Sequence, residues 1–338
     1  MNVEHQRNRR DGWGFIIPDF EQTSYGLFAM TRIEVRPNLH INGGVRFDQA
    51  HLHTHEYRDW YATPQADGTT AYVQRSADQR LRFTAPTWSL GANYNVGQWS
   101  LKANVGKSFR VPIAKELAAD GINYHIFRYE RGNSDLNAEE AYQVDVSALW
   151  TNGALRVQVE PFFNYFPNYI YLNPTSDYVE GLQLYAYTQA KVIRWGFEAE
   201  AVWAINKHWD AELRGDYLWA RQQSGDKRGY GLPFAPPWSI TPLVRYSFDW
   251  HGRTSFEVSA NIVGAQNDIV PPESPTDGYW RLDAAATKHF QIGRKTARIT
   301  LRATNILNKR YYDHTSYYRL IDVPEPGFNL SGIFAVEL

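Results

Sequence analysis

Strict alternation of apolar and polar residues is the feature of this chain that most constrains its fold. Between Trp209 and Arg221 the odd positions are apolar or aromatic almost without a break, and the even positions begin with four charged residues. A period of two residues places these two sets on opposite faces of an extended strand. Ten or more residues of this pattern, with aromatic residues near the ends, is typical of a strand that crosses an outer membrane between lipid and a water-filled lumen.

The same alternation recurs along the whole chain and predicts about fourteen strands. Besides 209–221, the ranges that carry it most clearly are 2–8, 24–36, 39–52, 84–96, 99–110, 140–150, 154–166, 182–205, 238–249, 253–263, 296–307 and 327–338. We interpret 182–205 as one very long strand that is bulged near Ala190. The last strand, which ends at Leu338, is expected to descend to the periplasm.

Short and long connections alternate between these strands. The short ones contain turn residues and lie at 36–38, 96–98, 151–153, 206–208, 250–252 and 293–295. The long ones lie at 9–23, 53–83, 111–139, 167–181, 222–237, 264–278 and 308–326. This order predicts an all-β fold, a transmembrane antiparallel up-and-down β-barrel with short turns on the periplasmic side. A soluble β-sandwich or propeller fits less well, because its strands usually have about five or six residues.

Composition excludes several other classes of protein. The net charge is −1, so no basic field for nucleic acid is present, and the absence of cysteine rules out disulfides and thiolate sites. The 12 Trp and 22 Tyr residues suit the interface between lipid and water. The chain contains no run of about 18 apolar residues, so the sequence predicts no membrane helix. No signal peptide is visible after Met1. For an outer-membrane protein this absence needs an explanation, and truncation of a longer chain is the simplest one.

Several short motifs occur in a fixed order along the chain. The most specific is Ser108-Phe109-Arg110-Val111-Pro112 with Glu116-Leu117, followed by Glu130-x-Gly132-Asn133-x-x-Leu136-x-x-Glu139. The others are Gln6-Arg7-Asn8 with Gly14–Pro18, Gly43–Asp48, Trp195–Glu198, Asn305–Tyr311 and Pro324–Gly327. Together these motifs resemble the C-terminal part of TonB-dependent outer-membrane receptors, from end to end of the chain.

The resemblance implies energy-coupled uptake of a scarce ligand, such as a ferric siderophore, haem, cobalamin, another metal chelate or a glycan. It also implies a 22-stranded barrel with a plugged lumen, of which residues 1–338 would form the last fourteen strands as one partial barrel domain. The family's plug domain and TonB-contacting segment have no counterpart here, so we expect a receptor fragment. The implied partners of the full-length protein are outer-membrane lipid of a Gram-negative bacterium, an external ligand, TonB and a plug domain, without nucleic acid.

Aromatic and cationic residues gather in two of the long loops. The candidate ligand-binding residues are Tyr124, His125, Arg128, Tyr129, Tyr312, His314, Tyr318 and Arg319. Aromatic faces together with arginine suit flat anionic ligands such as catecholate or haem complexes. The alternative is ordinary loop packing and anchoring at the membrane interface.

Two further sets of residues are candidates for function. Arg46, Glu198, Arg298 and Arg302 are expected to point into the lumen, where they face either a plug or water. His51, His53 and His55 share one face of an extended strand, and a His-x-His pair can chelate a transition metal. Their parity matches Val45 and Phe47, which places them outward above the membrane instead of in a pocket. The alternative to metal binding is that these three histidines lie in the solvated base of a loop.

Motifs of soluble enzymes fail in this chain. Gly106-Lys107-Ser108 resembles the end of a phosphate-binding loop, but Leu101 stands where the first glycine belongs. No nucleophile elbow and no zinc-protease pair occurs, so we predict neither an enzyme nor a cofactor. Two functions remain as alternatives to the receptor: a complete fourteen-stranded passive porin or fatty-acid channel, and a secreted β-rich adhesin or glycan-binding module.

Overall fold

A computed structural model describes residues 1–12, 14–65 and 67–336, and most of them belong to one antiparallel sheet. Fourteen strands follow one another through this sheet in chain order. They are β1 (Asn2–Asn8), β2 (Phe20–Arg36), β3 (Leu39–Thr54), β8 (Gln79–Val96), β9 (Trp99–Arg110), β12 (Glu139–Thr151), β13 (Leu155–Val179), β14 (Leu182–Ala204), β15 (Trp209–Gln222), β16 (Ser239–Asp249), β17 (Arg253–Val263), β18 (Tyr279–Ile292), β19 (Lys295–Thr304) and β20 (Asn329–Val336). The predicted all-β, antiparallel, up-and-down arrangement of about fourteen strands is therefore confirmed.

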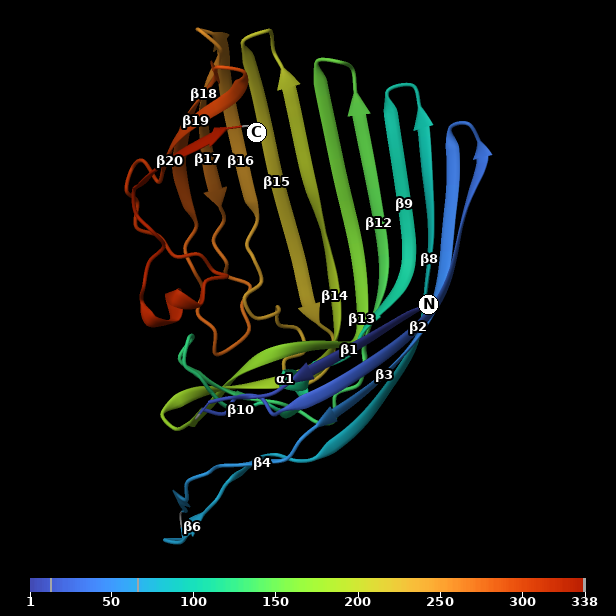
Figure 1. The fold of residues 1–338 in the computed structure, drawn as a ribbon, viewed down its shortest axis with the longest axis vertical. Coiled ribbons are helices and arrows are strands. Elements are labelled where there is room, and N and C mark those ends of the chain that lie inside the picture. The colour runs from blue at the N-terminus through green and yellow to red at the C-terminus, as the bar shows by residue number, and fades with distance from the viewer. Residues whose placement is uncertain (13, 66, 337–338) are drawn as a thin grey trace.

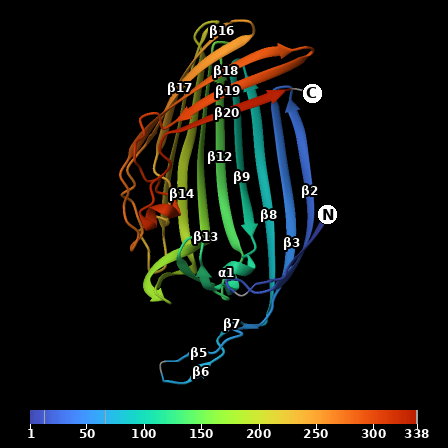
Figure 2. The same cartoon turned by 60° about the vertical axis from the view of Figure 1, so that its left-hand side comes forward.

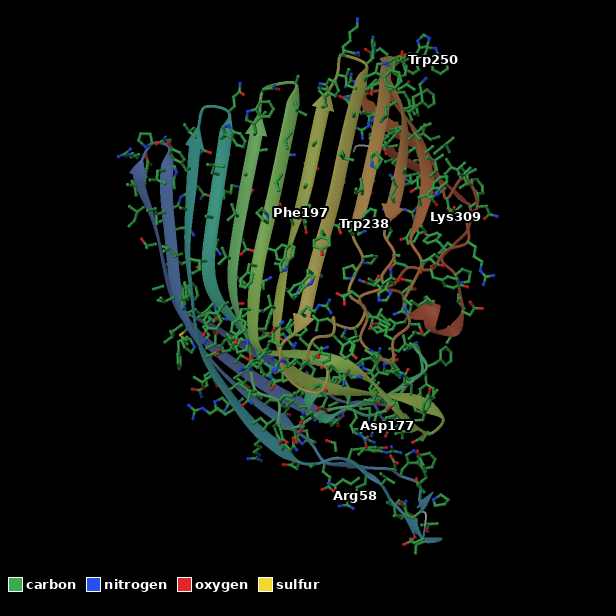
Figure 3. All side chains as sticks on the ribbon, turned by 180° about the vertical axis from the view of Figure 1, so that it is seen from behind. Arg58, Asp177, Phe197, Trp238, Trp250 and Lys309 are labelled. Atoms are coloured by element: carbon green, nitrogen blue, oxygen red, sulfur yellow. The ribbon has the colours of Figure 1, made fainter. Side chains whose placement is uncertain are left out.

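The sheet is a tall curved wall (Figures 1 and 2). Within the described residues, β1 pairs only with β2, and β20 pairs only with β19. The short turns predicted from the sequence lie at one end of the wall, near Trp250, and the long connections gather at the other end, near Arg58 and Asp177 (Figure 3). Residues 337 and 338, including the predicted terminal Leu338, lie outside the described residues.

Aromatic side chains mark two levels on the outward face of the wall. Near the short turns, Trp99 lies beside Trp150 on the neighbouring strand, with ring centroids 6.5 Å apart. Eight residues further along β12, Tyr142 lies beside Tyr165 at 6.4 Å. Eight residues of strand correspond to about 26 Å along the strand, or roughly 20 Å along the membrane normal at the usual tilt of about 40°, which is comparable with the apolar band of an outer-membrane barrel. No helix among the described residues is long and apolar enough to cross a membrane.

The prediction of a long loop at 167–181 is wrong, because β13 continues to Val179 and forms a tall hairpin with β14. Glu180 and Gly181 form its two-residue turn, and both have positive φ, 52° and 79°, as a hairpin turn of this kind requires. Pro167 and Pro174, which cannot donate a ladder hydrogen bond, both lie where the pairing shifts register. One of these shifts lies opposite Ala190–Val192, so the irregularity predicted near Ala190 exists, with the additional residue on β13.

Small loop elements pack against the inward face of the wall at the long-loop end. They are α1 (Ala114–Ala118), β10 (Asp120–Asn123), β11 (Arg128–Arg131) and the 3-10 helix η1 (Tyr317–Ile321). Leu52 of β3 and Ile170 of β13 are buried against α1. Val192 of β14 is buried in a second cluster with Phe166 and Leu232. These contacts identify the inward face of the strands on which they lie.

Outside the main sheet, residues 56–77 form a separate arm. It contains two small hairpins, β4 (Tyr57–Arg58) with β7 (Gln74–Ser76) and β5 (Thr63–Pro64) with β6 (Thr70–Ala71). The arm projects away from the long-loop end of the wall (Figures 1 and 2). The predicted loop 53–83 is thus shorter than expected, because β3 and β8 extend into it.

Asn305 ends β19 by bonding the backbone around it. Its amide donates to the carbonyls of Lys309 (2.9 Å) and Pro326 (3.2 Å) and its oxygen accepts from the Lys309 N–H (2.9 Å), while its own φ is 50°. We expect Asn305→Ala to lower the free energy of unfolding by about 1–3 kcal/mol, because these buried groups lose their partners. Asn305→Gly is the control, since it removes the side chain without the strain at positive φ. Chemical unfolding of both variants in lipid vesicles measures the difference, and equal stability of Asn305→Ala and the parent protein would contradict this role.

Candidate functional site

The most specific sequence motif folds into a charge cluster at the rim of the wall. Arg110 lies 2.6 Å from the Glu116 carboxylate and 3.2 Å from that of Glu139. Glu139 also accepts a 2.6 Å hydrogen bond from the backbone N–H of Ile170, which joins β12 to β13. Gly132 passes so close to α1 that a Cβ atom there would lie 2.5 Å from the backbone nitrogen of Ala118. The motif therefore fixes the loop 111–138 against the wall.

This fixed loop places Arg128 and Tyr129 in the interior. Glu130 is fully buried and binds both Arg128 (Nε–Oε1, 2.8 Å) and Lys115 (Nζ–Oε2, 2.5 Å). Burial acts to raise the pKa of Glu130, but the hydrogen bond from Lys115 and the charge of Arg128 outweigh it, so the pKa lies below its ordinary value. The carboxylate is thus ionised and compensated by two cations, which leaves a net positive charge here.

Tyr129 connects the same loop to the arm. Its hydroxyl donates to Asp120 (2.9 Å) and accepts from Arg75 (2.7 Å). Burial, together with the charge of Asp120, raises the pKa of Tyr129 above its ordinary value, so the phenol is protonated. Arg75 also pairs with Asp59 at 2.9 Å. Tyr129 is therefore part of a saturated network instead of a free ligand-binding group.

The second loop cluster, which contains His314 and Arg319, packs against the loop that carries Arg128. Glu273 binds His314 (Nε2–Oε1, 3.4 Å) and Arg319, and accepts a 3.1 Å hydrogen bond from the backbone N–H of Phe234. This hub holds Phe234 against Tyr317, with ring centroids 4.6 Å apart. Arg128 contacts the same Tyr317 ring. Its guanidinium carbon lies 4.7 Å from the ring centroids of both Tyr317 and Tyr185. The two predicted loop clusters, far apart in sequence, therefore meet at Arg128.

A cavity of about 320 Å³ opens where these clusters meet the hairpin. Its walls include Arg128, Arg194, Tyr169, Phe234 and Tyr317, and none of its described lining residues carries a carboxylate. Nη1 of Arg128 and Nε of Arg194 are buried without a hydrogen-bond partner among the described residues. Unpaired buried donors of this kind are costly unless a ligand or water satisfies them. The cavity can therefore accept an anion between two guanidinium groups and aromatic rings.

The predicted loop residues are divided between this cavity and its surroundings. Arg128 lines the cavity, while His314 and Arg319 are buried behind it. Tyr312 donates to Asp322 at 2.5 Å on the loop surface, and Tyr124, His125 and Tyr318 are exposed. Sequence reasoning missed Arg194 and Tyr169, because 167–181 was interpreted as a loop and Arg194 as an ordinary strand residue. The repeated Tyr-x-Tyr spacing around Tyr169 and Tyr185 was the signal that could have revealed them.

A larger hollow of about 890 Å³ lies along β2 and β3. Its lining includes Met30, Arg46 and Asp48, and Arg46 shares the parity of buried Leu52 on the inward face. None of its described lining residues has a buried polar atom without a partner, so we place the site in the smaller cavity.

The four residues expected in the lumen share faces with residues that the structure buries inside. Arg46 has the parity of Leu52 on β3 and bonds Asp48 (Nε–Oδ2, 2.6 Å), and Glu198 has the parity of Val192 on β14. Glu198 stands directly between Glu160 and Asp216 on the adjacent strands. Arg302 stands opposite Ala285, on the face that carries buried Tyr279, and Arg298 shares its parity. Contact of these residues with a plug stays a prediction.

The histidine triplet divides into two parts. His53 and His55 lie close to Asp78, with their ligand atoms within 4.8 Å of one another. His51 hydrogen-bonds Gln49 and stands edge-on to Tyr25, outside this group. His51 and His53 have the parity of exposed Val45 and Phe47, on the outward face.

Comparison with known proteins gives a family and a set of similar folds. A family model described as TonB dependent receptor-like, beta-barrel, matches residues 5–307. The copper transporter OprC is similar with a TM-score of 0.77 and 17% identity, over 93% of this chain and 48% of that one. The ferric-catecholate import receptor Fiu from E. coli K12 has a TM-score of 0.64 and 18% identity, over 94% and 45%. The ferric yersiniabactin uptake receptor FyuA from Yersinia pestis has a TM-score of 0.60 and 17% identity, over 94% and 45%. The chain spans about half the length of these proteins.

Proposed function

The chain belongs to the TonB-dependent receptor family through its β-barrel domain, and from this premise we propose that it forms the ligand-binding wall of an outer-membrane receptor for energy-coupled uptake. TonB, a plug domain and the outer-membrane lipid of a Gram-negative bacterium are the partners that this function requires. The two aromatic levels on the outward face support the membrane setting. The passive-channel and adhesin alternatives receive no support from the matched family.

We propose an anionic, aromatic metal chelate as the ligand class. The observation that carries this is the cavity with Arg128 and Arg194. Within the part of the chain that the structure describes, each of these two cations has a buried N–H without a hydrogen-bond partner, and no carboxylate lines the cavity. A volume of about 320 Å³ is at the lower end of small-molecule sites. It suits one arm of a chelate, with the rest of the ligand in the lumen. Fiu, which shares the fold, is described as an import receptor for ferric catecholates.

Arg194→Gln tests this proposal, because Arg194 is not part of the Glu130 ion pairs. We expect affinity for the ferric tris-catecholate complex to fall roughly 10–100-fold, the loss of a charge-assisted hydrogen bond. Affinity for a neutral ferric trihydroxamate should change little. Quenching of tryptophan fluorescence in the purified protein gives both dissociation constants.

Two further variants make the result specific. Arg128→Lys keeps the charge that Glu130 requires but removes the planar donors, so it should also weaken catecholate binding. Arg82→Ala is the matched control, because Arg82 lies on the outward face and bonds Gln49. Equal affinities in Arg194→Gln and Arg82→Ala would show that the cavity does not select anions.

A further inference from the structure

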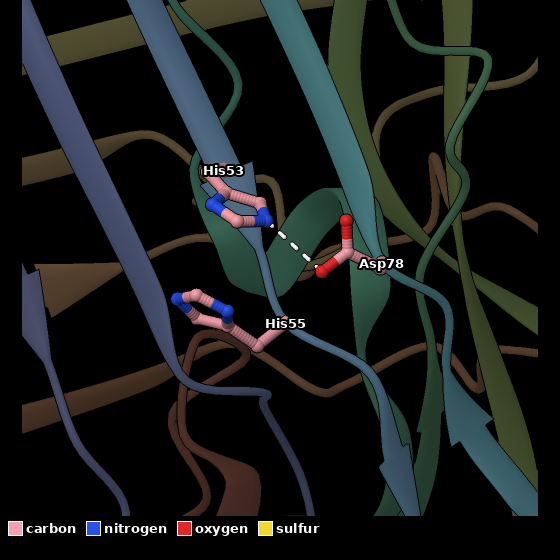
Figure 4. A group of neighbouring side chains, drawn as sticks. All are labelled: His53, His55 and Asp78. Carbon is pink, nitrogen blue, oxygen red and sulfur yellow. Dashed lines mark hydrogen bonds and ion pairs between the residues drawn. The ribbon is translucent and has the colours of Figure 1, made fainter.

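His53, His55 and Asp78 form a compact group of metal-ligand donors that the uptake site does not use. His53 Nε2 lies 3.0 Å from Asp78 Oδ2, and the His53 and His55 rings are 4.2 Å apart between centroids (Figure 4). One donor atom from each of the three residues lies within 4.8 Å of the others. Small side-chain rotations therefore suffice to direct all three at one ion.

The backbone explains why these three residues meet. The ladder between β3 and β8 ends at the pair Thr54–Gln79, and the ladder of the arm begins at the pair Tyr57–Ser76. Residues 55, 56, 77 and 78 lie between these two ladders without pairing to each other. His55 and Asp78 thus flank the arm, on the two chain segments that lead into and out of it, where no backbone pairing joins them. His53 joins them from the end of β3, on its outward face.

We propose that His53, His55 and Asp78 bind a divalent transition-metal ion of the zinc class, which bridges this break in the ladder. Two imidazoles and one carboxylate are the donor set that Zn²⁺ accepts, with water in the remaining position. Oxygen-seeking ions such as Mg²⁺ and Ca²⁺ disfavour a site in which two of three donors are nitrogen. Asp78 supplies the negative charge, and burial of the two histidines is only partial, so the ion can enter from solvent.

Bound metal would fasten the arm to the wall. The arm is anchored by Arg75, which binds Asp59 within it and Tyr129 and Glu180 outside it. At its root, the described residues 55–56 and 77–78 are not joined by backbone pairing, and the contact between His53 and Asp78 is the side-chain link already described. A metal ion at the root adds a further link, through His55, and reduces the freedom of residues 56–77. This site is independent of the ligand cavity, because it lies on the outward face and shares none of its lining residues.

Calorimetric titration of the untagged protein with Zn²⁺ tests the site. We expect one ion per chain, and His53→Ala, His55→Ala or Asp78→Asn should each weaken binding at least about tenfold, since even an outer partner of a metal ligand costs that much. His51→Ala is the matched control, because His51 has the same residue type and face but lies outside the group. Arg80→Gln should tighten binding, because Arg80 stands opposite His53 and its charge opposes a cation.

Limited proteolysis of the arm provides a second readout. Zn²⁺ should slow cleavage within residues 56–77 of the parent protein and of His51→Ala, and EDTA should restore it. The variants of the three proposed ligands should be cleaved at the same rate with and without Zn²⁺. Equal Zn²⁺ affinity in His51→Ala and His55→Ala, or no binding by the parent protein, would overturn the proposal. Catecholate affinity should be unchanged in all of these variants, so failure of this site and failure of the uptake function are distinguishable.

Discussion

Glu130→Ala is expected to lower the free energy of local opening in the loop 114–131 by about 3–5 kcal/mol, the cost of leaving a buried charge without its partner. Glu130 is completely buried and binds Lys115 and Arg128, and the Arg128 side chain is only 6% exposed. Without this carboxylate, the Arg128 guanidinium has no ion pair with any residue that the structure describes. Hydrogen exchange of the amides in this segment measures the opening free energy directly.

The matched control is Glu180→Ala, which removes a half-exposed carboxylate at 3.4 Å from Arg75. A pair of this kind contributes about 0–1 kcal/mol, so the control should exchange almost like the parent protein. The contribution of Glu130 also depends on pH. Because its pKa is lowered on folding, the stabilisation is present above the ordinary carboxyl pKa and is lost as the pH falls through the folded value. A difference of less than 1 kcal/mol between the two variants would contradict this role for Glu130.

Ala103→Arg is expected to destabilise the wall by about 2–4 kcal/mol in lipid vesicles, the cost of a cation on the lipid face near the bilayer centre. Ala103 pairs with Val146, halfway between the two aromatic levels of β12. Its neighbour Asn104 points to the opposite face and stands across from Asp145. Asn104→Arg places the same side chain in the lumen, beside a carboxylate, and should cost little.

Chemical unfolding of both variants in lipid vesicles, with the same lipid and denaturant, gives the difference. A larger loss in Asn104→Arg than in Ala103→Arg would reverse the assignment of the two faces. If both cost the same in vesicles, the outward face at this level would not be in contact with lipid.

The strands could be predicted from the sequence because each face of the wall meets a single environment, either lipid or water, along its whole length. Alternation persists where lipid and water are the only neighbours, as on β15. It failed for 167–181, where the hairpin rises above the membrane and both of its faces meet other protein segments. There Tyr169 and Tyr171 pack according to local contacts, and the prolines coincide with register shifts.

The candidate site could be predicted only in part, for a related reason. Composition identified aromatic and cationic loops, and Arg128 proved to lie at the point where they meet. The sequence contained no sign that Glu130 would pair with Arg128 and Glu273 with Arg319, or that Nε of Arg194 would be buried without a hydrogen-bond partner among the described residues. Glu273 and Arg319 are 46 residues apart in the sequence, and contacts of this kind follow only from the folded loops. The metal-donor group was predicted as three histidines, whereas Asp78 replaces His51 because the arm returns to the root of β3.

The parallel pairing of β11 with β14 gives the loop that carries Arg128 an unusual mechanical character. Tyr129, Glu130 and Arg131 are paired in register with Leu184, Tyr185 and Ala186 of the tall hairpin. A force on a ligand in the proposed site would therefore be transmitted along a strand and into the wall, as shear on the strand pairing, instead of bending a flexible loop. Arg128 would then keep its position under load, and any movement at this end of the molecule would be taken up by the segments around the loop.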